Sequence, residues 1–560
     1  MRMLLAVLCL SLPLAGQDGG DPTADLAAFD SWLKDYKSGA IRLLQKGQVV
    51  ESELNRVRAV ISGVAKWNTL TTAKRLFELA SLDILPPGSA RSSTDRAAFL
   101  TEIRIFQVRG LARDAIATMD AREIEDWLLE VVKKRPDKAY GDVASASGAA
   151  LRILAQRPSE RAKKAMLEAC GSFKPEVRVH AVNAMSTAPS LALVPHFAGL
   201  LRDKEPYVRI AAINGMCRAL APHTDETRHA KVEAKIAQLR DTTIDAIRPV
   251  ILRDKVWQVR ACARENLAIL KTKKSIPVLI EALAAELARK KDPWSLDVRL
   301  HRTLEGLTGI RMPLGQVQTW QAFWRKEGAT FAFAREQPKG KQNGKEAKSS
   351  KYEKFFKLEL QSNRLLFVID LSGSMVEPIT LKTFGVGTGA GAPEKRTTTK
   401  AKLVVEELKK MVMTLKDGDL FNIIVFSDDV RVWRARDDGR PALVKMSDQV
   451  RDDLLGGYLD NLQPAGLTNL HGALDCALGF GGRGLHDKYY ELGYDTLYVL
   501  SDGAPTTGKV TDTEEILRMV REVNSLRRLT INTITFGFLN QVAFLKKLAE
   551  QNGGRHIHVD

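Results

Sequence analysis

The stretch that most constrains the fold of this chain is "LLFVIDLSGSM", residues 365–375. Its first five residues are all apolar, which is typical of a strand covered on both faces in the middle of a parallel sheet. The run ends abruptly in a carboxylate, Asp370, followed by two hydroxyls, Ser372 and Ser374. Gly373 between them predicts a tight turn that brings both hydroxyls to the same side.

The sequence after this strand alternates short apolar runs with helical patterns. We expect further strands at 420–426, 495–503, 529–538 and 556–559, and helices at 397–415, 511–526 and 541–554. A capping box of Thr511 with Glu514 is expected to begin the second of these helices. The alternation predicts a doubly wound, Rossmann-like α/β domain, in which ligands bind at the carboxyl ends of the strands where the strand order reverses.

Oxygen-bearing side chains gather at these predicted strand ends. Asp502 ends the later buried strand, and the polar loop "PAGLTNLHGAL" at 464–474 carries Thr468. Together with Asp370 and the two serines they offer two carboxylates and three hydroxyls, the ligands that a hard cation prefers. We therefore predict one bound Mg²⁺, with Mn²⁺ or Ca²⁺ as alternatives, and an open position for an acidic group of a partner.

These motifs resemble the metal-ion-dependent adhesion site of von Willebrand factor type A (VWA) domains. The pattern Asp-x-Ser-x-Ser after a buried strand, a later Thr and a later Ser-Asp-Gly stand in family order, and "LKKLAEQNGGRHIHV" is similar to the closing helix and strand of such domains. The resemblance implies a VWA domain over 361–560. It implies metal ligands at Asp370, Ser372, Ser374, Thr468 and Asp502, the last often through water. The alternative is a degenerate domain that binds no metal.

A long Gly-rich segment at 376–400 separates the first predicted strand from its helix. It is not a phosphate-binding loop, because it lacks the Gly-Lys-Ser/Thr ending. It either shapes the choice of partner or is a tolerated surface insertion.

Upstream, residues 23–330 are almost wholly helical in pattern and contain a faint internal repeat. "KPEVRVHAVNAM" at 174–185 matches "EPYVRIAAINGM" at 205–216, with looser copies at 256–267 and 296–307. The copies share Arg178, Arg209, Arg260 and Arg299. The segment resembles HEAT repeats, which predicts an all-α solenoid of stacked helix pairs. Such a solenoid is either a docking surface for a partner or a structural spacer.

The N-terminus is typical of a secretory signal peptide over residues 1–16, with a basic Arg2 and an apolar core from Leu4 to Leu14. Residue 17 is Gln rather than Cys, so we expect no lipid anchor. A buried N-terminal helix is the alternative. We expect a secreted or periplasmic protein with no transmembrane segment, and a basic flexible linker at 331–360 between the two domains.

The formal net charge of +17 is unevenly distributed. From Arg364 onward the acidic and basic residues nearly cancel, so the positive charge belongs to the upstream part. That charge predicts contact with anionic surfaces, or simply a solvated helical face. The cysteines beyond the signal peptide, Cys170, Cys217, Cys262 and Cys476, show no zinc-binding spacing and are expected to be isolated buried thiols.

The sequence contains no catalytic constellation, so we expect a binding protein rather than an enzyme. The leading hypothesis is a secreted or periplasmic adhesion module that grips an acidic group, Asp or Glu, of a partner protein through the metal, with the helical repeats as scaffold or second docking surface. One alternative is a structural or assembly protein of the cell envelope, in which the solenoid binds and the metal only stabilises. Another is polyanion binding by the basic repeats. No specific recognition of nucleic acid is expected.

Overall fold

The computed structural model describes most of the chain. The described residues are 21–38, 41, 44–45, 48–81, 108–133, 146–157, 159–187, 190–220, 230–289, 295–333, 354–356, 358–360, 362–383, 394–437, 439–479, 493–536 and 539–559. The predicted signal peptide and residues 334–353 of the predicted linker lie outside them, so both stay predictions.

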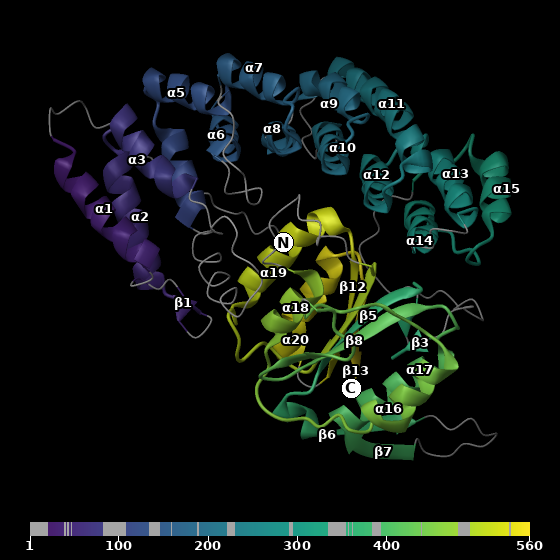
Figure 1. The fold of residues 1–560 in the computed structure, drawn as a ribbon. Helices are drawn as coiled ribbons and strands as arrows, with labels where there is room; N and C mark the ends of the chain where they lie inside the picture. The colour runs from purple at the N-terminus through teal and green to yellow at the C-terminus, as the bar shows by residue number, and fades with distance from the viewer. Residues whose placement is uncertain are drawn as a thin grey trace.

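The N-terminal part is helical, apart from a short hairpin of β1 (Leu44–Gln45) and β2 (Gln48–Val49). Its labelled helices are α1 (Thr23–Ser38), α2 (Glu51–Ala65), α3 (Leu70–Ala80), α5 (Arg122–Lys133), α6 (Ala146–Leu154), α7 (Glu160–Ala169), α8 (Pro175–Thr187), α9 (Val194–Leu200), α10 (Pro206–Leu220), α11 (Ala230–Arg253), α12 (Trp257–Leu270), α13 (Ser275–Leu287), α14 (Leu296–Thr308) and α15 (Val317–Glu327). A further helix covers residues 108–118. Together they form an arc over the C-terminal domain (Figure 1).

From α5 onward the arc consists of two rows of helices. Helices α6, α8, α10, α12 and α14 pack on one another along the inner row, whereas α9, α11, α13 and α15 follow one another along the outer row (Figure 1). Successive helices such as α9 and α10, α11 and α12, or α13 and α14 pack across the two rows. This stack of helix pairs confirms the predicted all-α architecture, while the assignment to HEAT repeats stays a prediction.

The arginines shared by the sequence repeat form a ladder along the stack. Three of them pair with an acid of the following repeat at 2.7 Å: Arg178 with Asp203, Arg209 with Asp254, and Arg260 with Glu286. Each also donates through Nη1 to the carbonyl six residues earlier, at 2.7–2.9 Å. The repeat signal in the sequence is therefore the signature of inter-repeat ion pairs.

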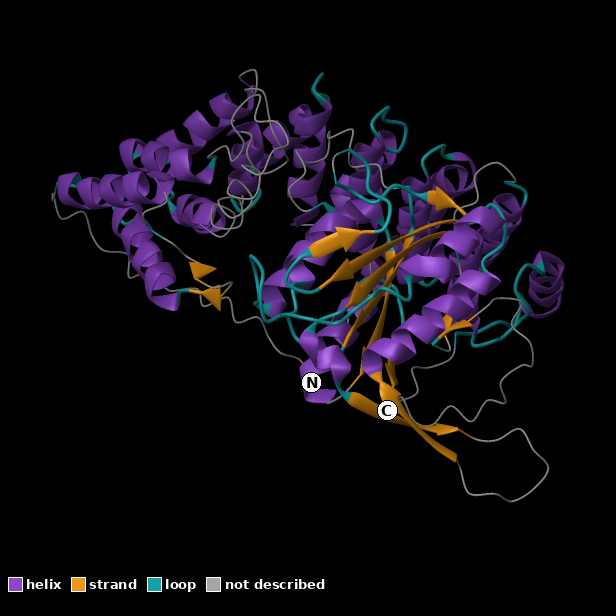
Figure 2. Ribbon diagram, turned by 60° about the horizontal axis from the view of Figure 1, so that its bottom comes forward, coloured by secondary structure: helices purple, strands orange, loops and turns teal. Residues whose placement is uncertain are grey.

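The C-terminal part is built around a seven-stranded sheet of order β10-β8-β5-β11-β12-β13, with β9 beside β8 (Figure 2). Its strands are β5 (Arg364–Asp370), β8 (Leu420–Phe426), β9 (Val430–Val432), β10 (Val444–Lys445), β11 (Thr496–Ser501), β12 (Thr530–Phe536) and β13 (His556–Val559). Strands β8, β5, β11, β12 and β13 are parallel, and β9 and β10 run antiparallel to β8. Two small hairpins accompany the sheet: β3 (Lys354–Phe355) with β4 (Leu358–Glu359), and β6 (Pro378–Thr383) with β7 (Glu394–Thr399).

Helices cover both faces of this sheet, as the apolar run of β5 requires. They are α16 (Lys400–Thr414), α17 (Asp448–Asp453), α18 (Leu470–Leu478), α19 (Thr513–Arg527) and α20 (Leu539–Gln551). Helix α16 belongs to the core on one face, and α18, α19 and α20 belong to the core on the other. The chain runs from β5 to β8 on one side, then returns to β11, β12 and β13 on the other. The domain is therefore doubly wound, as predicted, and its strand order reverses between β5 and β11.

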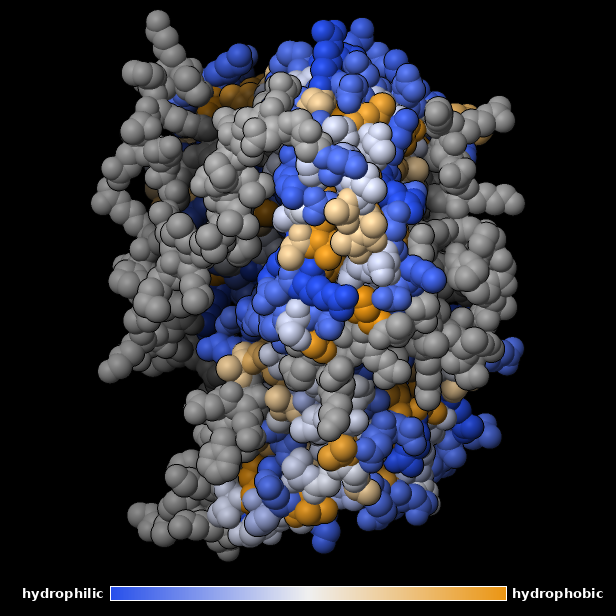
Figure 3. All heavy atoms as spheres, turned by 90° about the vertical axis from the view of Figure 1, so that its left-hand side faces the viewer, coloured by the Kyte–Doolittle hydropathy of each residue, from blue (hydrophilic) through white to orange (hydrophobic). Residues whose placement is uncertain are grey.

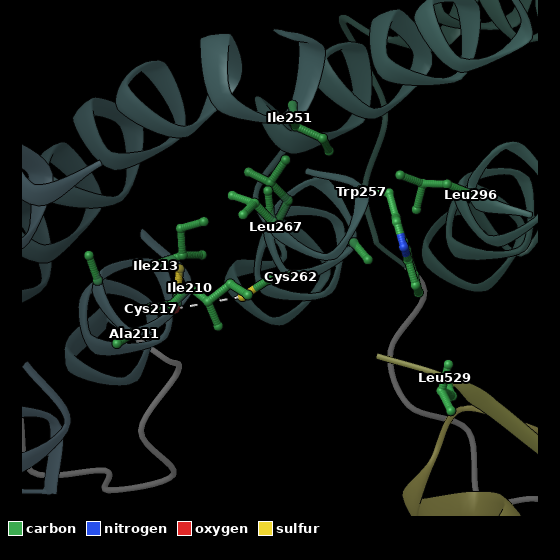
Figure 4. Close-up of a cluster of buried hydrophobic side chains, with 14 of the residues drawn as sticks. Ile210, Ala211, Ile213, Cys217, Ile251, Trp257, Cys262, Leu267, Leu296 and Leu529 are labelled. Atoms are coloured by element: carbon green, nitrogen blue, oxygen red, sulfur yellow. Dashed lines mark hydrogen bonds between the residues drawn. The ribbon is translucent and has the colours of Figure 1, made fainter. Parts of the chain in front are cut away.

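The two parts share one hydrophobic core. The cluster that contains the buried residues of α10, α12 and α14 continues into α18, α19 and the start of β12. Figure 4 shows this continuity, with Trp257 and Leu296 of the helical arc near Leu529, which precedes β12. The arc therefore packs against the end of the domain where the parallel strands begin.

Polar contacts fix the same junction. The fourth shared arginine, Arg299, donates to the carbonyl of Arg528 at 2.5 Å and to that of Asp495 at 2.8 Å. The Asp495 carboxylate accepts from the backbone N–H of Ser295 at 2.7 Å and from its hydroxyl at 2.9 Å. Arg528 in turn pairs with Glu265 of α12. The last arginine of the sequence repeat therefore bonds to the C-terminal domain.

The described cysteines and the surface complete the picture. Cys170, Cys217 and Cys262 are buried, Cys476 is half-buried, and all four are free thiols, as expected.

On the face shown in Figure 3, hydrophilic residues predominate and apolar residues form small separate groups. Across the described residues, no helix combines the length and apolar character that crossing a bilayer requires.

Candidate functional site

Asp370 ends the central strand β5 and is fully buried. Its Oδ1 accepts from the backbone N–H of Ser372 at 2.8 Å, and its Oδ2 accepts from the hydroxyl of Ser501 at 2.5 Å. Burial raises the pKa of Asp370 to about 6, although these hydrogen bonds oppose the rise. Ser501, the last residue of β11, is the serine of the Ser-Asp-Gly motif, and the sequence analysis did not assign it a role in the site.

The other predicted ligands follow in a hydrogen-bonded row. The Oγ atoms of Ser372 and Ser374 are 3.1 Å apart, and Ser374 Oγ donates to Asp502 Oδ1 at 2.9 Å. Ser372 and Asp502 are buried, whereas Ser374 is exposed. The middle residue of the row, Ser374, is therefore the one that reaches the surface, whereas the residues at both ends are buried.

The donor set suits a hard divalent cation, because carboxylate and hydroxyl oxygens are the ligands that such ions prefer. The separations of 2.9 and 3.1 Å between these oxygens are hydrogen-bond distances. In the described part of the chain, no three His, Cys, Asp or Glu side chains gather to hold an ion, so the donor set here depends on hydroxyls.

Backbone hydrogen bonds join the loop that contains Thr468 to the loop that carries Ser372 and Ser374. The N–H of Ala465 donates to the carbonyl of Leu371 at 2.9 Å, and the N–H of Gly373 donates to that of Gly466 at 2.8 Å. Thr468 itself is buried, and its N–H donates to the hydroxyl of Thr506 at 2.9 Å. The structure therefore places the loop that carries Thr468 against the loop that carries Ser372 and Ser374.

Gly373 is required for a reason other than the one predicted. Its φ angle is not in the left-handed region. Instead, a Cβ atom at this position would lie 3.2 Å from the carbonyl oxygen of Gly466, tighter than ordinary contact. The close approach of the two loops, rather than a turn that only glycine can make, explains this residue. Gly466 does have a positive φ of 77°, and a Cβ there would overlap the Asp428 carboxylate.

A lysine that the sequence analysis did not identify completes the site. Lys400, the first residue of α16, places its Nζ 2.8 Å from Asp502 Oδ2 and 2.6 Å from Glu377 Oε2. Its side chain is buried. Burial lowers the pKa of Lys400, but the hydrogen bonds to the two carboxylates outweigh it and raise the pKa overall. A lysine at the start of a helix, where cations are disfavoured, was the available signal.

The two ends of the Gly-rich segment form a β-ribbon, whereas the glycines at 385–391 lie outside the described residues. Strands β6 and β7 pair in antiparallel register from Pro378 with Thr399 to Thr383 with Glu394. Figure 2 shows this ribbon projecting away from the main sheet. The ribbon begins directly after Glu377 and ends directly before Lys400, so both of its ends lie next to residues of the site. Whether it shapes the choice of partner or is a tolerated insertion stays a prediction.

Two apolar side chains are exposed next to the candidate ligands. Val376 is 55% exposed and lies two residues after Ser374, and Leu467 is 52% exposed and directly precedes Thr468. They stand on the two loops that the Gly373–Gly466 hydrogen bond joins. The exposed rim of the site therefore carries apolar as well as charged groups.

The curated relatives of this protein align with about a third of the chain. This chain is 31% identical over 206 residues to human inter-alpha-trypsin inhibitor heavy chain H4, and the aligned region covers 36% of this chain and 19% of that protein. It is 29% identical over 191 residues to human heavy chain H2, which covers 34% of this chain and 17% of that protein. The chain thus spans less than a fifth of the length of these relatives.

A solved von Willebrand factor type A protein from Catenulispora acidiphila aligns with 35% of this chain and 38% of its own, at 18% identity and a TM-score of 0.25. No family model matches the chain. The C-terminal region has a parallel sheet with helices on both faces, consistent with the Rossmann-like VWA fold that the sequence motifs imply.

Proposed function

We propose that this protein is an extracytoplasmic protein-binding module that engages an acidic group of a partner through one divalent metal ion, with Mg²⁺ as the favoured ion. The ion would be held by Asp370, Ser372, Ser374 and Thr468, with Asp502 completing the shell. The observation that carries the proposal is that hydrogen bonds gather Asp370, Ser372, Ser374 and Asp502 at the point where the strand order reverses.

The chemistry of the donor set supports an acidic partner. When bound, Mg²⁺ would supply a Lewis-acidic position for an oxygen of the partner. The hydroxyl ligands are neutral, so they add no negative charge to that of the two carboxylates and leave the ion electrophilic toward an incoming carboxylate. Asp370 and Ser372 are buried and would anchor the ion from below, while the exposed Ser374 marks the side that a partner can reach.

The exposed apolar rim favours a protein as the partner. A free anion would gain nothing from Val376 and Leu467, whereas a protein surface can cover both while placing a carboxylate between the two loops. The relatives called inter-alpha-trypsin inhibitor heavy chains are, by name, subunits of a larger assembly, which agrees with an interaction role. The location outside the cytoplasm depends on the predicted signal peptide.

The helical arc is proposed as the scaffold of the module. It packs against the end of the sheet where the strands begin, whereas the candidate metal site lies at the opposite end. Three of the ladder arginines pair with acids, so these side chains serve the packing of the arc, while the net positive charge upstream of Arg364 is unchanged by the pairing. Polyanion binding by this region therefore stays the alternative.

The test is calorimetric titration of Mg²⁺, Mn²⁺ and Ca²⁺ into the full chain, with Asp370→Ala as the variant. We expect saturable binding of one ion, tightest for Mg²⁺ or Mn²⁺ and lost in the variant. Partner proteins are then captured in Mg²⁺ and in EDTA. A partner that binds equally well in EDTA, or to Asp370→Ala, would contradict the metal-mediated mechanism and favour binding by the helical arc.

A further inference from the structure

Lys400 occupies a position that is unfavourable for a lysine on two counts. It is the first residue of α16, where the helix dipole repels a positive charge. Its side chain is only 7% exposed, and burying an ammonium is costly unless it is paired. The backbone N–H of Lys400 donates to the carbonyl of Glu377 at 3.1 Å, which fixes the start of the helix beside the site. The two carboxylates that Lys400 contacts must therefore account for its presence.

The two oxygens of Asp502 have different donors. Oδ1 accepts from Ser374, itself a candidate ligand, at 2.9 Å, and Oδ2 accepts from Lys400 at 2.8 Å. The lysine thus holds the carboxylate from the side away from the hydroxyl row. Glu377, its second partner, is 61% exposed, so water screens much of its charge. In the buried part of the site, the ammonium of Lys400 therefore offsets the charge of Asp502.

We propose that Lys400 is a positioning residue and internal counter-ion of the site: it keeps Asp502 oriented in the metal-free protein and lowers the affinity for the divalent ion. The inference rests on the proposed function. Two buried carboxylates with one ammonium carry less negative charge than the carboxylates alone, so a divalent cation is attracted less strongly. The same ammonium leaves the ion-loaded site positively charged, which favours an acidic group of a partner.

The test compares Lys400→Met with Lys402→Met in the full chain. Methionine preserves the length of the side chain and removes its charge, and Lys402 is an exposed lysine two residues further along the same helix. We measure thermal unfolding in EDTA and the affinity for Mg²⁺ by calorimetry at constant ionic strength. For Lys400→Met we expect a melting temperature lowered by a few degrees in EDTA and an Mg²⁺ affinity at least ten-fold tighter. Lys402→Met should match the wild type in both.

Lys400→Gln separates charge from hydrogen bonding, because the amide can still donate to Asp502. We expect it to bind Mg²⁺ nearly as tightly as Lys400→Met and to unfold in EDTA closer to the wild type. In an Asp502→Asn background, the effect of Lys400→Met on the melting temperature in EDTA should largely vanish, since the lysine acts through that carboxylate. A lysine that merely fills space would not show this dependence.

The outcomes distinguish this inference from the proposed function. If the wild type binds Mg²⁺ and both Lys400 variants bind it equally or more weakly, the counter-ion role is wrong and the metal function stands. If the wild type does not bind but Lys400→Met does, the lysine blocks the site, which supports the counter-ion role. If neither protein binds Mg²⁺, both the metal function and the counter-ion role are overturned.

Discussion

At the scale of single residues, the environment of Asp370 decides how the site behaves. A carboxyl group that is fully buried and has a pKa of about 6 ionises less readily than an exposed one, and a bound cation would favour its charged form. The buried amine of Lys400 supplies part of the compensation through Asp502. The metal-free site is therefore held together by hydrogen bonds around charges that burial disfavours.

The raised pKa of Asp370 predicts a pH-dependent effect of Asp370→Asn. The pKa of Asp370 is about 6 in the folded protein and 3.8 in its ordinary state. Protonated Asp370 therefore contributes its full share to the free energy of unfolding below pH 3.8, and this contribution is lost as the pH rises through about 6. In EDTA at pH 7.5 we expect the variant to be more stable than the wild type by on the order of 2 kcal/mol. The difference in the free energy of unfolding between variant and wild type should be smaller at pH 5, and urea unfolding at both pH values measures it.

Saturating Mg²⁺ at pH 7.5 should reverse this order, since only the wild type binds the ion well and ligand binding stabilises the folded state. Equal stabilities in EDTA across this pH range would contradict the assigned environment of Asp370. Loss of the reversal alone would argue against metal binding.

The apolar rim gives a second prediction at this scale. The double variant Val376→Ser/Leu467→Ser should bind Mg²⁺ within about two-fold of the wild type, because neither side chain is a proposed ligand. Binding of a partner found by Mg²⁺-dependent capture should weaken by roughly ten-fold or more, as buried apolar area is lost from the interface. Met413→Ser, at another exposed apolar position, is the control. Unchanged partner affinity in the double variant would exclude the rim from the interface.

At the scale of elements, the sequence patterns located strands and helices well and their ends less well. The helix predicted over 397–415 is α16, which begins at Lys400, with Thr399 as the N-cap. The predicted capping box of Thr511 with Glu514 is wrong by one residue: Asp512 caps α19 and accepts from the N–H of Glu515 at 2.8 Å. Both pairs have the same spacing, and the path of the chain out of the preceding loop selects one of them.

The arginine ladder also belongs to this scale, and it predicts unequal effects of two Arg→Met changes. Arg260 and Glu286 form a pair whose side chains are 0% and 2% exposed, whereas Arg248 and Glu281 are about half exposed. Arg260→Met should cost about 3 kcal/mol, because it leaves Glu286 buried with fewer partners. Arg248→Met should cost less than about 1 kcal/mol. Urea unfolding measures both, and similar costs would contradict a structural role for the ladder.

At the scale of the whole molecule, the shared core makes the two parts one folding unit. Arg299 bonds to two carbonyls of the C-terminal domain, and its guanidinium lies 5.4 Å from the centre of the Trp257 ring. An isolated C-terminal fragment would expose Leu529 and leave Asp495 without Ser295. Binding experiments therefore require the full chain.

This coupling predicts the form of thermal unfolding. The wild type should unfold in one calorimetric transition, whereas Arg299→Met should separate the helical arc from the C-terminal domain and give two. Arg325→Met, at an exposed position on α15, should leave the single transition intact. Two transitions already present in the wild type would show that the junction does not couple the parts.

The sequence by itself determined the helical arc, the doubly wound sheet and the group of predicted ligands, because hydrophobic periodicity and strand-end chemistry are local properties of the chain. The tertiary structure decided what depends on distant segments meeting. Lys400 reaches Asp502 across 102 residues, and the last repeat arginine reaches the C-terminal domain across more than 190. No local pattern encodes such pairings, since each requires the sheet to form and the helical arc to pack against its far end.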